Sequence, residues 1–421
     1  MEIKYVDGGI CAPHGFMAAG MQVGISHKPL NTDNTNTNEF KPKKKKNDLG
    51  LIVSDTMCSA AAVYTQNKVK GAPIVVTKKH LQDGLAKAVI VNSKNANTCN
   101  ADGEEKADAM CKLAANALKI DSSDVIVAST GVIGQVLDIT PIEKNIEALA
   151  DKLSYDGSDA CATAIMTTDT KKKEYAVEFK LGDKVCHIGG ISKGSGMIHP
   201  NMATTLSFLT SDVSITPSLL HSMLSEVVKV TFNRISIDGD QSTNDMACIM
   251  ANGLAGNELI DSKNESYFIM KENLLSIMTT LAKDIAADGE GATKLLECTV
   301  SNAPTEIIAE TIAKSVIQST LFKTAMVGED ANWGRILCAV GYADAEFDIN
   351  KVDVALGSNK GTIDVCKNGA GVEFSEDTAK TILEEDEIKI LINLNQGKEA
   401  ATAWGCDLTY DYVKINGDYR S

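Results

Sequence analysis

The stretch GGISKGSGMIHPNMATTLSFLTSD, residues 189–212, crowds a lysine, several glycines and a proline directly before an apolar run. Lys193 precedes a Gly-Ser-Gly sequence, and backbone of this kind can fold into a nest of N–H donors for an anion. The GxxxxGK[ST] spacing of a nucleotide-binding P-loop is absent. Composition alone favours a simpler interpretation, in which a glycine loop leads into an ordinary buried strand over residues 203–211.

The segments on either side of this stretch alternate between two kinds of pattern. Short apolar, β-branched runs predict strands, and longer runs with a helical period predict helices. The mixture predicts an α/β or α+β layered sandwich, and 421 residues are enough for two or more lobes. The predicted strands are 49–55, 72–78, 86–93, 124–129, 335–347 and 387–394, and the predicted helices are 104–120, 217–232 and 273–288.

Composition excludes several classes of protein. A formal net charge of −15 argues against nucleic acid or an anionic membrane as the main partner. No apolar run is long enough to span a bilayer, and residues 1–16 lack the pattern of a secretory signal. The 11 cysteines contain no CxxC pair, which predicts reduced thiols in the cytoplasm. The 6 histidines are dispersed, so we expect no metal site.

Residues Asn31–Asp48 differ from the rest of the chain. They are polar and low in complexity, and they include a lysine run from Lys43 to Lys46. A role at nucleic acid or a membrane surface is conceivable, but the acidic remainder of the chain favours a solvated, poorly ordered loop.

Two further motifs contain residues suited to catalysis or binding. In VIVASTGVIGQ, Thr130 and Gly131 follow a predicted strand, where a hydroxyl and a backbone N–H can stabilise an oxyanion. In AADGEGATK, Glu290 stands between two glycines and can receive a cationic group. A plain strand-to-turn transition and an exposed acidic turn are the respective structural alternatives.

The motif RISIDGDQSTND, residues 234–245, resists a simple assignment. An EF-hand loop starting at Asp238 would need glycine and glutamate where Thr243 and Ile249 stand. A phosphoryl-transfer enzyme with an aspartate nucleophile would need a downstream acidic pair, which we do not find. The aromatic C-terminal residues 402–421 predict either a final strand or a segment that reaches into a site.

Taken together and in order, these motifs closely resemble the ornithine acetyltransferase family of arginine biosynthesis, the bifunctional glutamate N-acetyltransferases. The similarity extends from GGICAPHGFMAAG through STGVIG, AIMTTDT, KGSGMIHPNMATTL, FNRISIDGDQSTND and DGEGATK to DLTYDYVKINGDYRS. The resemblance implies a self-processing fold with an N-terminal threonine. It also implies cleavage between Ala203 and Thr204 into an α chain, 1–203, and a β chain, 204–421, assembled as two of each.

By the same resemblance, Thr204 carries the acetyl group from N-acetylornithine to glutamate, and Thr130 and Gly131 form the oxyanion hole. The free α-amine of Thr204, with a pKa of about 7.7–8.0, can act as its base. No cofactor is implied, although acetyl-CoA is a possible co-substrate of a second activity. The implied substrate-binding residues are Thr167, Lys193, Thr204, Glu290, Asn416 and Ser421, with the choice between Thr167 and Thr168 left open.

Four features depart from the family pattern. The 31–48 insertion is longer than expected, and Lys94 replaces a usual glycine, so the local backbone there can differ. Ser421 replaces a frequent threonine, and His14 replaces a frequent lysine. Two other functions remain as alternatives: a self-processing amide hydrolase of the related aminopeptidase group, in which water resolves the acyl-enzyme, and an uncleaved scaffold.

Overall fold

The computed structural model of the chain describes residues 3–25, 46–199 and 205–417. The predictions for Ala203, Thr204 and Ser421 therefore lie outside the described residues, as does most of the 31–48 insertion. No helix in the described part is long and apolar enough to cross a membrane.

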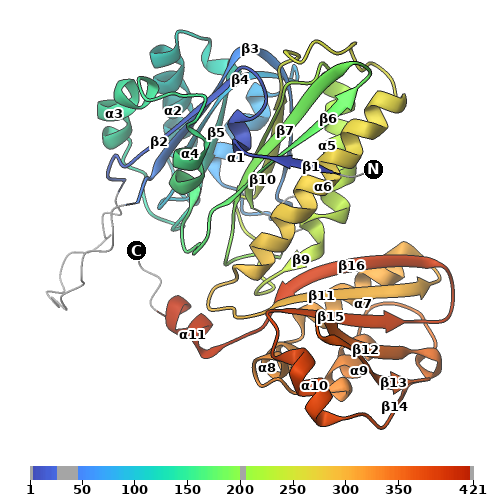
Figure 1. Cartoon of the computed structure of the whole chain (residues 1–421). Helices are drawn as coiled ribbons and strands as arrows, with labels where there is room; N and C mark the ends of the chain where they lie inside the picture. The colour runs from blue at the N-terminus through green and yellow to red at the C-terminus, as the bar shows by residue number, and fades with distance from the viewer. Residues whose placement is uncertain (1–2, 26–45, 200–204, 418–421) are drawn as a thin grey trace, which may run out of the picture.

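Within the described residues, the larger of two sheets has nine strands in the order β1-β6-β7-β8-β10-β3-β4-β5, with β2 paired to β3 (Figure 1). The β8–β10 and β4–β5 pairs are parallel, whereas the other pairs are antiparallel. The strands are β1 (Lys4–Val6), β2 (Phe16–Met21), β3 (Leu49–Tyr64), β4 (Leu85–Asn92), β5 (Val125–Ser129), β6 (Lys173–Leu181), β7 (Lys184–Lys193), β8 (Leu206–Ser211) and β10 (Met246–Ala251).

Helices pack on both sides of this sheet. Ile188 of β7 joins the core formed with α5 and α6, whereas Ile191 joins the core formed with α4. Side chains alternate between the two faces of a strand, so β7 contributes to two separate apolar layers. The helices are α1 (Ala72–His80), α2 (Gly103–Leu118), α3 (Thr140–Ala150), α4 (Ser158–Ile165), α5 (Pro217–Val230) and α6 (Glu265–Ala287), with short 3-10 turns η1 (Gly9–Cys11), η2 (Ser122–Asp124) and η3 (Phe232–Arg234).

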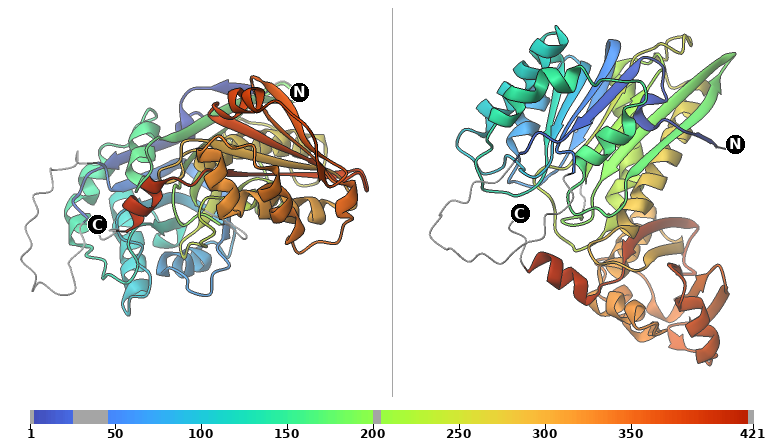
Figure 2. Two further views of the ribbon diagram at one scale, coloured as in Figure 1. Left: turned by 90° about the horizontal axis from the view of Figure 1, so that it is seen from below. Right: turned by 60° about the vertical axis from the view of Figure 1, so that its left-hand side comes forward.

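The smaller sheet has the order β14-β13-β12-β15-β11-β16-β9 and its own apolar core. It forms a second lobe beside the first, and the last helix, α11, extends from it towards the larger lobe (Figure 2). Its elements are β9 (Ile235–Ser236), β11 (Leu295–Ala303), α7 (Glu306–Gln318), α8 (Thr320–Val327), α9 (Trp333–Gly341), η4 (Ile349–Lys351), β12 (Asp353–Ser358), β13 (Gly361–Lys367), β14 (Ala370–Gly371), α10 (Glu376–Leu383), β15 (Glu387–Asn393), β16 (Glu399–Cys406) and α11 (Tyr410–Asn416).

The predicted layered α/β architecture is confirmed, but two predicted strands are wrong. Residues 72–78 belong to helix α1, because Pro73 in its first turn starts a helix well and outweighs the β-branched composition. Residues 335–341 belong to α9, where the side chain of Asn332 caps the helix by accepting a hydrogen bond from the backbone N–H of Arg335. The C-terminal stretch contains a strand and a helix: its first part pairs in β16, and Asn416 of α11 then contacts Glu290.

Strands from both sides of residue 204 make up the larger sheet. β8 and β10 lie between β7 and β3, so two strands that follow residue 204 occupy the middle of a sheet whose other strands precede it. The smaller sheet is built entirely from residues that follow 204.

Candidate active site

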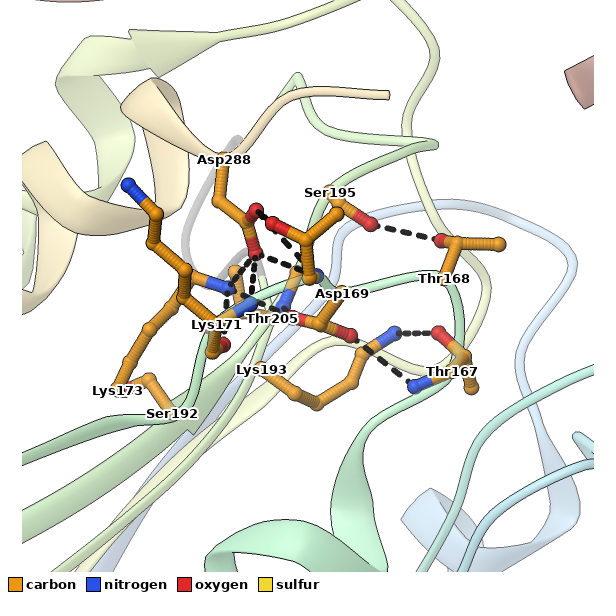
Figure 3. A network of polar contacts seen from close by, with 12 residues as sticks. Thr167, Thr168, Asp169, Lys171, Lys173, Ser192, Lys193, Ser195, Thr205 and Asp288 are labelled. Carbon is orange, nitrogen blue, oxygen red and sulfur yellow. Dashed lines mark hydrogen bonds and ion pairs between the residues drawn. The ribbon is translucent and has the colours of Figure 1, made fainter. Parts of the chain in front are cut away.

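Lys193 connects three segments that are far apart in the sequence. It is the last residue of β7, and its Nζ donates hydrogen bonds to Thr130 Oγ1 at 3.1 Å and to Thr167 Oγ1 at 3.2 Å. Thr130 follows β5, and Thr167 lies just after α4 (Figure 3 shows the Lys193–Thr167 contact). Three residues that the sequence predicted for one site therefore meet.

The turn after β5 requires glycine at position 131. Gly131 has a φ of +133°, and a Cβ there would lie 2.0 Å from the carbonyl carbon of Lys94. The backbone N–H of Thr130 donates to the carbonyl of Asn92 at 3.0 Å, and that of Val132 donates to the carbonyl of Lys94 at 3.0 Å. The turn is thus pressed against the loop after β4, which leaves no room for a side chain at Gly131.

Lys94 keeps the backbone conformation that suits a glycine. Its φ is +76°, in the left-handed region that costs a residue with a side chain about 1–2 kcal/mol. Its Nζ forms an ion pair at 2.8 Å with Asp48, which is fully buried. Asp48 also accepts the backbone N–H groups of Val23, Gly24 and Ile25. Lys94 stands where glycine is usual in the family, and the left-handed backbone conformation next to Gly131 is kept despite this replacement.

A buried ion network supports this group of residues (Figure 3). Lys173 is 1% exposed, and its Nζ lies 2.8 Å from Asp169 Oδ1 and 2.6 Å from Asp288 Oδ2. Asp288 also accepts hydrogen bonds from the backbone and hydroxyl of Thr170. Sequence analysis missed this network, because no local pattern links Lys173 to Asp288, 115 residues further along the chain.

Asp169 links this network to the glycine-rich loop. Its carboxylate accepts the N–H of Gly194 at 2.7 Å and that of Thr167 at 3.0 Å. Burial alone would raise the pKa of Asp169, but Lys173, Lys193 and the hydrogen bond from the Gly194 N–H hold that pKa at about 2. The carboxylate is therefore ionised at neutral pH. It orients Gly194, which follows Lys193 in the chain, and Thr167, which contacts the Nζ of Lys193.

Lys193 is a buried lysine whose Nζ bonds to hydroxyl groups. None of the carboxylates in the described residues forms an ion pair with its Nζ. Burial lowers the pKa of Lys193, and three surrounding carboxylates oppose that shift, those of Asp169, Asp245 and Glu290. An anionic ligand beside this Nζ would favour its charged form, so the position suits the binding of an anion.

Glu290 meets the same loop from the other side. Its backbone N–H donates to the carbonyl of Ser195 at 2.8 Å, and its Oε2 accepts the side-chain amide of Asn416 at 2.7 Å. A Cβ at Gly196 would lie 2.4 Å from the Glu290 carboxylate, so this glycine makes room for it. Two more predicted residues, Glu290 and Asn416, are thus in direct contact next to the loop that follows Lys193.

The two neighbouring threonines point to different partners. Thr167 bonds to Lys193, whereas the hydroxyl of Thr168 lies 2.7 Å from that of Ser195 (Figure 3). A cavity of about 460 Å³ opens beside this region, between the end of α6 and α11. Its lining includes Thr170, Lys171, Asp288, Gly291, Asp411 and Lys414.

One group of side chains has the chemistry of a metal site but lies elsewhere. The ligand atoms of His14, His187 and Asp212 lie within 4.8 Å of one another, near the end of β7 opposite to Lys193. Asp212 already accepts the Nδ1 of His187 at 2.8 Å and the backbone N–H groups of both histidines. Wide spacing in the sequence hid this cluster, and the absence of a metal site stays a prediction.

Lys173→Met tests the importance of the buried ion network. The change would leave two buried carboxylates without their shared cation, so we expect the free energy of unfolding to fall by about 3–5 kcal/mol. Urea unfolding measures the effect, and Lys171→Met, which alters an exposed neighbour, is the matched control. Equal stability of the two variants would contradict the assigned role of Lys173.

Lowering the pH should weaken the contribution of Asp169 to the free energy of unfolding. Its folded-state pKa of about 2 lies below the value of about 3.9 in an unfolded chain. Its stabilising effect is therefore present above pH 4 and is lost as the pH falls towards 2. The difference in unfolding free energy between the natural protein and Asp169→Asn should shrink over that interval in urea titrations. A difference that stays constant would be evidence against an ionised Asp169.

Comparison with known proteins places this chain in a family. The family model described as ArgJ family matches residues 34–421. The arginine biosynthesis bifunctional protein ArgJ of Caldanaerobacter subterraneus subsp. tengcongensis is 46% identical over 422 residues, with 100% of each chain covered. ArgJ 1 of Clostridium acetobutylicum is 50% identical over 377 residues, which cover 89% of this chain and 92% of that one. A crystal structure of the Bacillus halodurans protein is 45% identical and covers 50% of this chain and 98% of that one, with a TM-score of 0.48. The chain belongs to the ArgJ family.

Proposed function

We propose that the chain transfers the acetyl group of N-acetylornithine to glutamate through an acetyl ester on Thr204. Family membership makes it an acetyltransferase of arginine biosynthesis. The observation that best supports the assigned site is the contact of Lys193 with both Thr130 and Thr167. Thr204 itself lies outside the described residues, and its role is carried by its position in the matched motif.

Self-cleavage would create the nucleophile. The hydroxyl of Thr204 attacks the carbonyl carbon of Ala203, the peptide C–N bond breaks, and water hydrolyses the resulting ester. The products are an α chain that ends at Ala203 and a β chain that begins at Thr204. The new α-amine then lies on the same residue as the hydroxyl and can accept its proton near neutral pH.

Acetyl transfer would use the same groups a second time. Thr204 attacks the acetyl carbonyl, and the Thr130 hydroxyl and the Gly131 N–H stabilise the oxyanion. Ornithine leaves, and the amine of glutamate takes the acetyl group from the ester. Because two substrates share one acyl-enzyme, the scheme predicts ping-pong kinetics.

The charges at the site suit an amino-acid substrate. Lys193 can bind a carboxylate, because its buried Nζ bonds to hydroxyl groups and forms no ion pair with a carboxylate of the described residues. Glu290, already in contact with Asn416, can bind the side-chain ammonium group of ornithine. Ser421, which lies outside the described residues, completes the proposed set.

The partners are proposed on the same basis. The α and β chains would assemble as two of each in the cytoplasm, with neither nucleic acid nor a membrane as a partner. No cofactor is needed for the scheme, and acetyl-CoA would serve as the acetyl donor in the second activity. The remaining alternative is an amide hydrolase, which would release acetate when glutamate is absent.

Thr204→Ala tests the central proposal. The natural protein should give two bands on a denaturing gel and transfer acetyl groups only when glutamate is present, because glutamate resolves the ester. The variant should give one full-length band and no transfer. A natural protein that remains intact, or a variant that cleaves and transfers normally, would refute the scheme, and rapid acetate release without glutamate would favour the hydrolase.

The two threonines offer a sharper test of the substrate site. Thr167→Val removes a hydroxyl bonded to a buried cation, which is worth about 1.5–3 kcal/mol. We expect a drop of roughly tenfold to a hundredfold in kcat/KM for N-acetylornithine. Thr168→Val is the matched control, because its hydroxyl contacts Ser195 instead. A larger loss in the control would reassign the site to Thr168.

A further inference from the structure

Two histidines and a buried aspartate meet at the end of β7 that is remote from Lys193. His14 lies in the turn before β2, His187 belongs to β7, and Asp212 directly follows β8. A ring nitrogen of each histidine and a carboxylate oxygen of Asp212 lie within 4.8 Å of one another. No step of the proposed acetyl transfer uses these side chains.

The pairing of β7 with β8 brings His187 beside Asp212. Ile188 is the register partner of Ser211, so the residues next to this pair face each other at the end of the two strands. The His187 N–H donates to Asp212 Oδ1 at 2.7 Å, and its Nδ1 lies 2.8 Å from Oδ2. Both the backbone and the ring of this histidine are therefore fixed against one carboxylate.

The backbone of His14 is held on two sides. Its N–H donates to Asp212 Oδ2 at 3.2 Å, and its carbonyl accepts the Nδ2 of Asn252 at 2.8 Å. The ring of His14 meets that of His187 edge-on, with centroids 5.4 Å apart. The turn before β2 therefore presents a second imidazole next to the first.

The three side chains form a ligand set that zinc prefers. Zinc binds imidazole nitrogen and carboxylate oxygen, and three protein ligands with one open position are a common arrangement. Its tetrahedral ligand atoms, each about 2.1 Å from the metal, lie roughly 3.4 Å apart. The Asp212 side chain is 0% exposed and that of His187 is 13% exposed, whereas His14 is exposed. The His14 ring can therefore turn to close the remaining distance.

The charges around the cluster favour a cation. Glu178 adds a second carboxylate, whose Oε2 lies 3.8 Å from the Nε2 of His187. Lys4 opposes this effect, because its Nζ pairs with the other oxygen of Glu178 at 2.6 Å. Two carboxylates against one lysine leave the neighbourhood of the two imidazoles negative, and a divalent cation would be attracted to it.

We propose that His14, His187 and Asp212 bind a zinc ion that clamps the turn before β2 to the adjacent ends of β7 and β8. Because His14 is exposed, water can take the fourth position on the metal. The expectation of no metal site came from the wide spacing of the histidines in the sequence, and the paired strands remove that spacing. The site is independent of the proposed acetyl transfer.

His14→Lys tests the site, because lysine is frequent at this position in the family and its ammonium group cannot bind a metal. Equilibrium dialysis of the purified protein against micromolar Zn²⁺ measures the bound metal. Exposed Cys99 and Cys338 can also bind zinc, so the difference between proteins is the informative quantity. We expect the natural protein to bind one zinc ion per chain more than the variant. Mg²⁺ in excess should not compete, because it prefers oxygen ligands.

Two matched variants complete the experiment. His221→Gln changes an exposed histidine of α5 outside the cluster and should bind as much zinc as the natural protein. His14→Gln removes the ligand without adding a charge and should behave like His14→Lys.

Thermal unfolding gives a second readout, because a ligand of the folded state raises the melting temperature. Zinc should raise the melting temperature of the natural protein and of His221→Gln, EDTA should reverse the rise, and both His14 variants should lack it. Equal zinc binding by the natural protein and the folded His14 variants would overturn the proposal. A zinc-dependent rise that persists in those variants would overturn it as well.

Discussion

The ion pairs of Lys173 with Asp169 and Asp288 are the constraint on which the site depends. They join the start of β6 to the end of α6, two elements 115 residues apart in sequence. Asp169 also accepts the N–H groups of Gly194 and Thr167. It therefore fixes the loop after β7 and the threonine that contacts Lys193. Without a cation between them, two buried carboxylates would repel each other, and both attachments would loosen.

The shared sheet explains how the chain would remain folded after the proposed cleavage. β7 and β8 are paired neighbours, so the proposed break would fall in the connection between two strands of one sheet. β8 and β10 are held on both sides by strands from the other portion of the chain. Backbone hydrogen bonds and the apolar layers on both faces would therefore hold the α and β chains together after cleavage.

Sequence predicted the layered architecture and the residues that meet around Lys193, because short motifs fix local chemistry and their order matched a known family. It failed where local composition and tertiary context disagree, as in residues 72–78, whose β-branched side chains suggested a strand that Pro73 turns into a helix. It also failed to find Lys173 and Asp288. The importance of these residues comes from burial and from partners far along the chain, which no local pattern reveals.

Asp48 has a further consequence for how the chain tolerates change. The residue accepts three N–H groups from Val23 to Ile25, donates its own N–H to Met21 and binds Lys94, so it closes the base of the connection between β2 and β3. A closed base separates the number of residues between Ile25 and Asp48 from the geometry of the turn at Gly131. A change in that number should therefore leave the turn in place and cost only a loop-closure entropy that grows slowly with length.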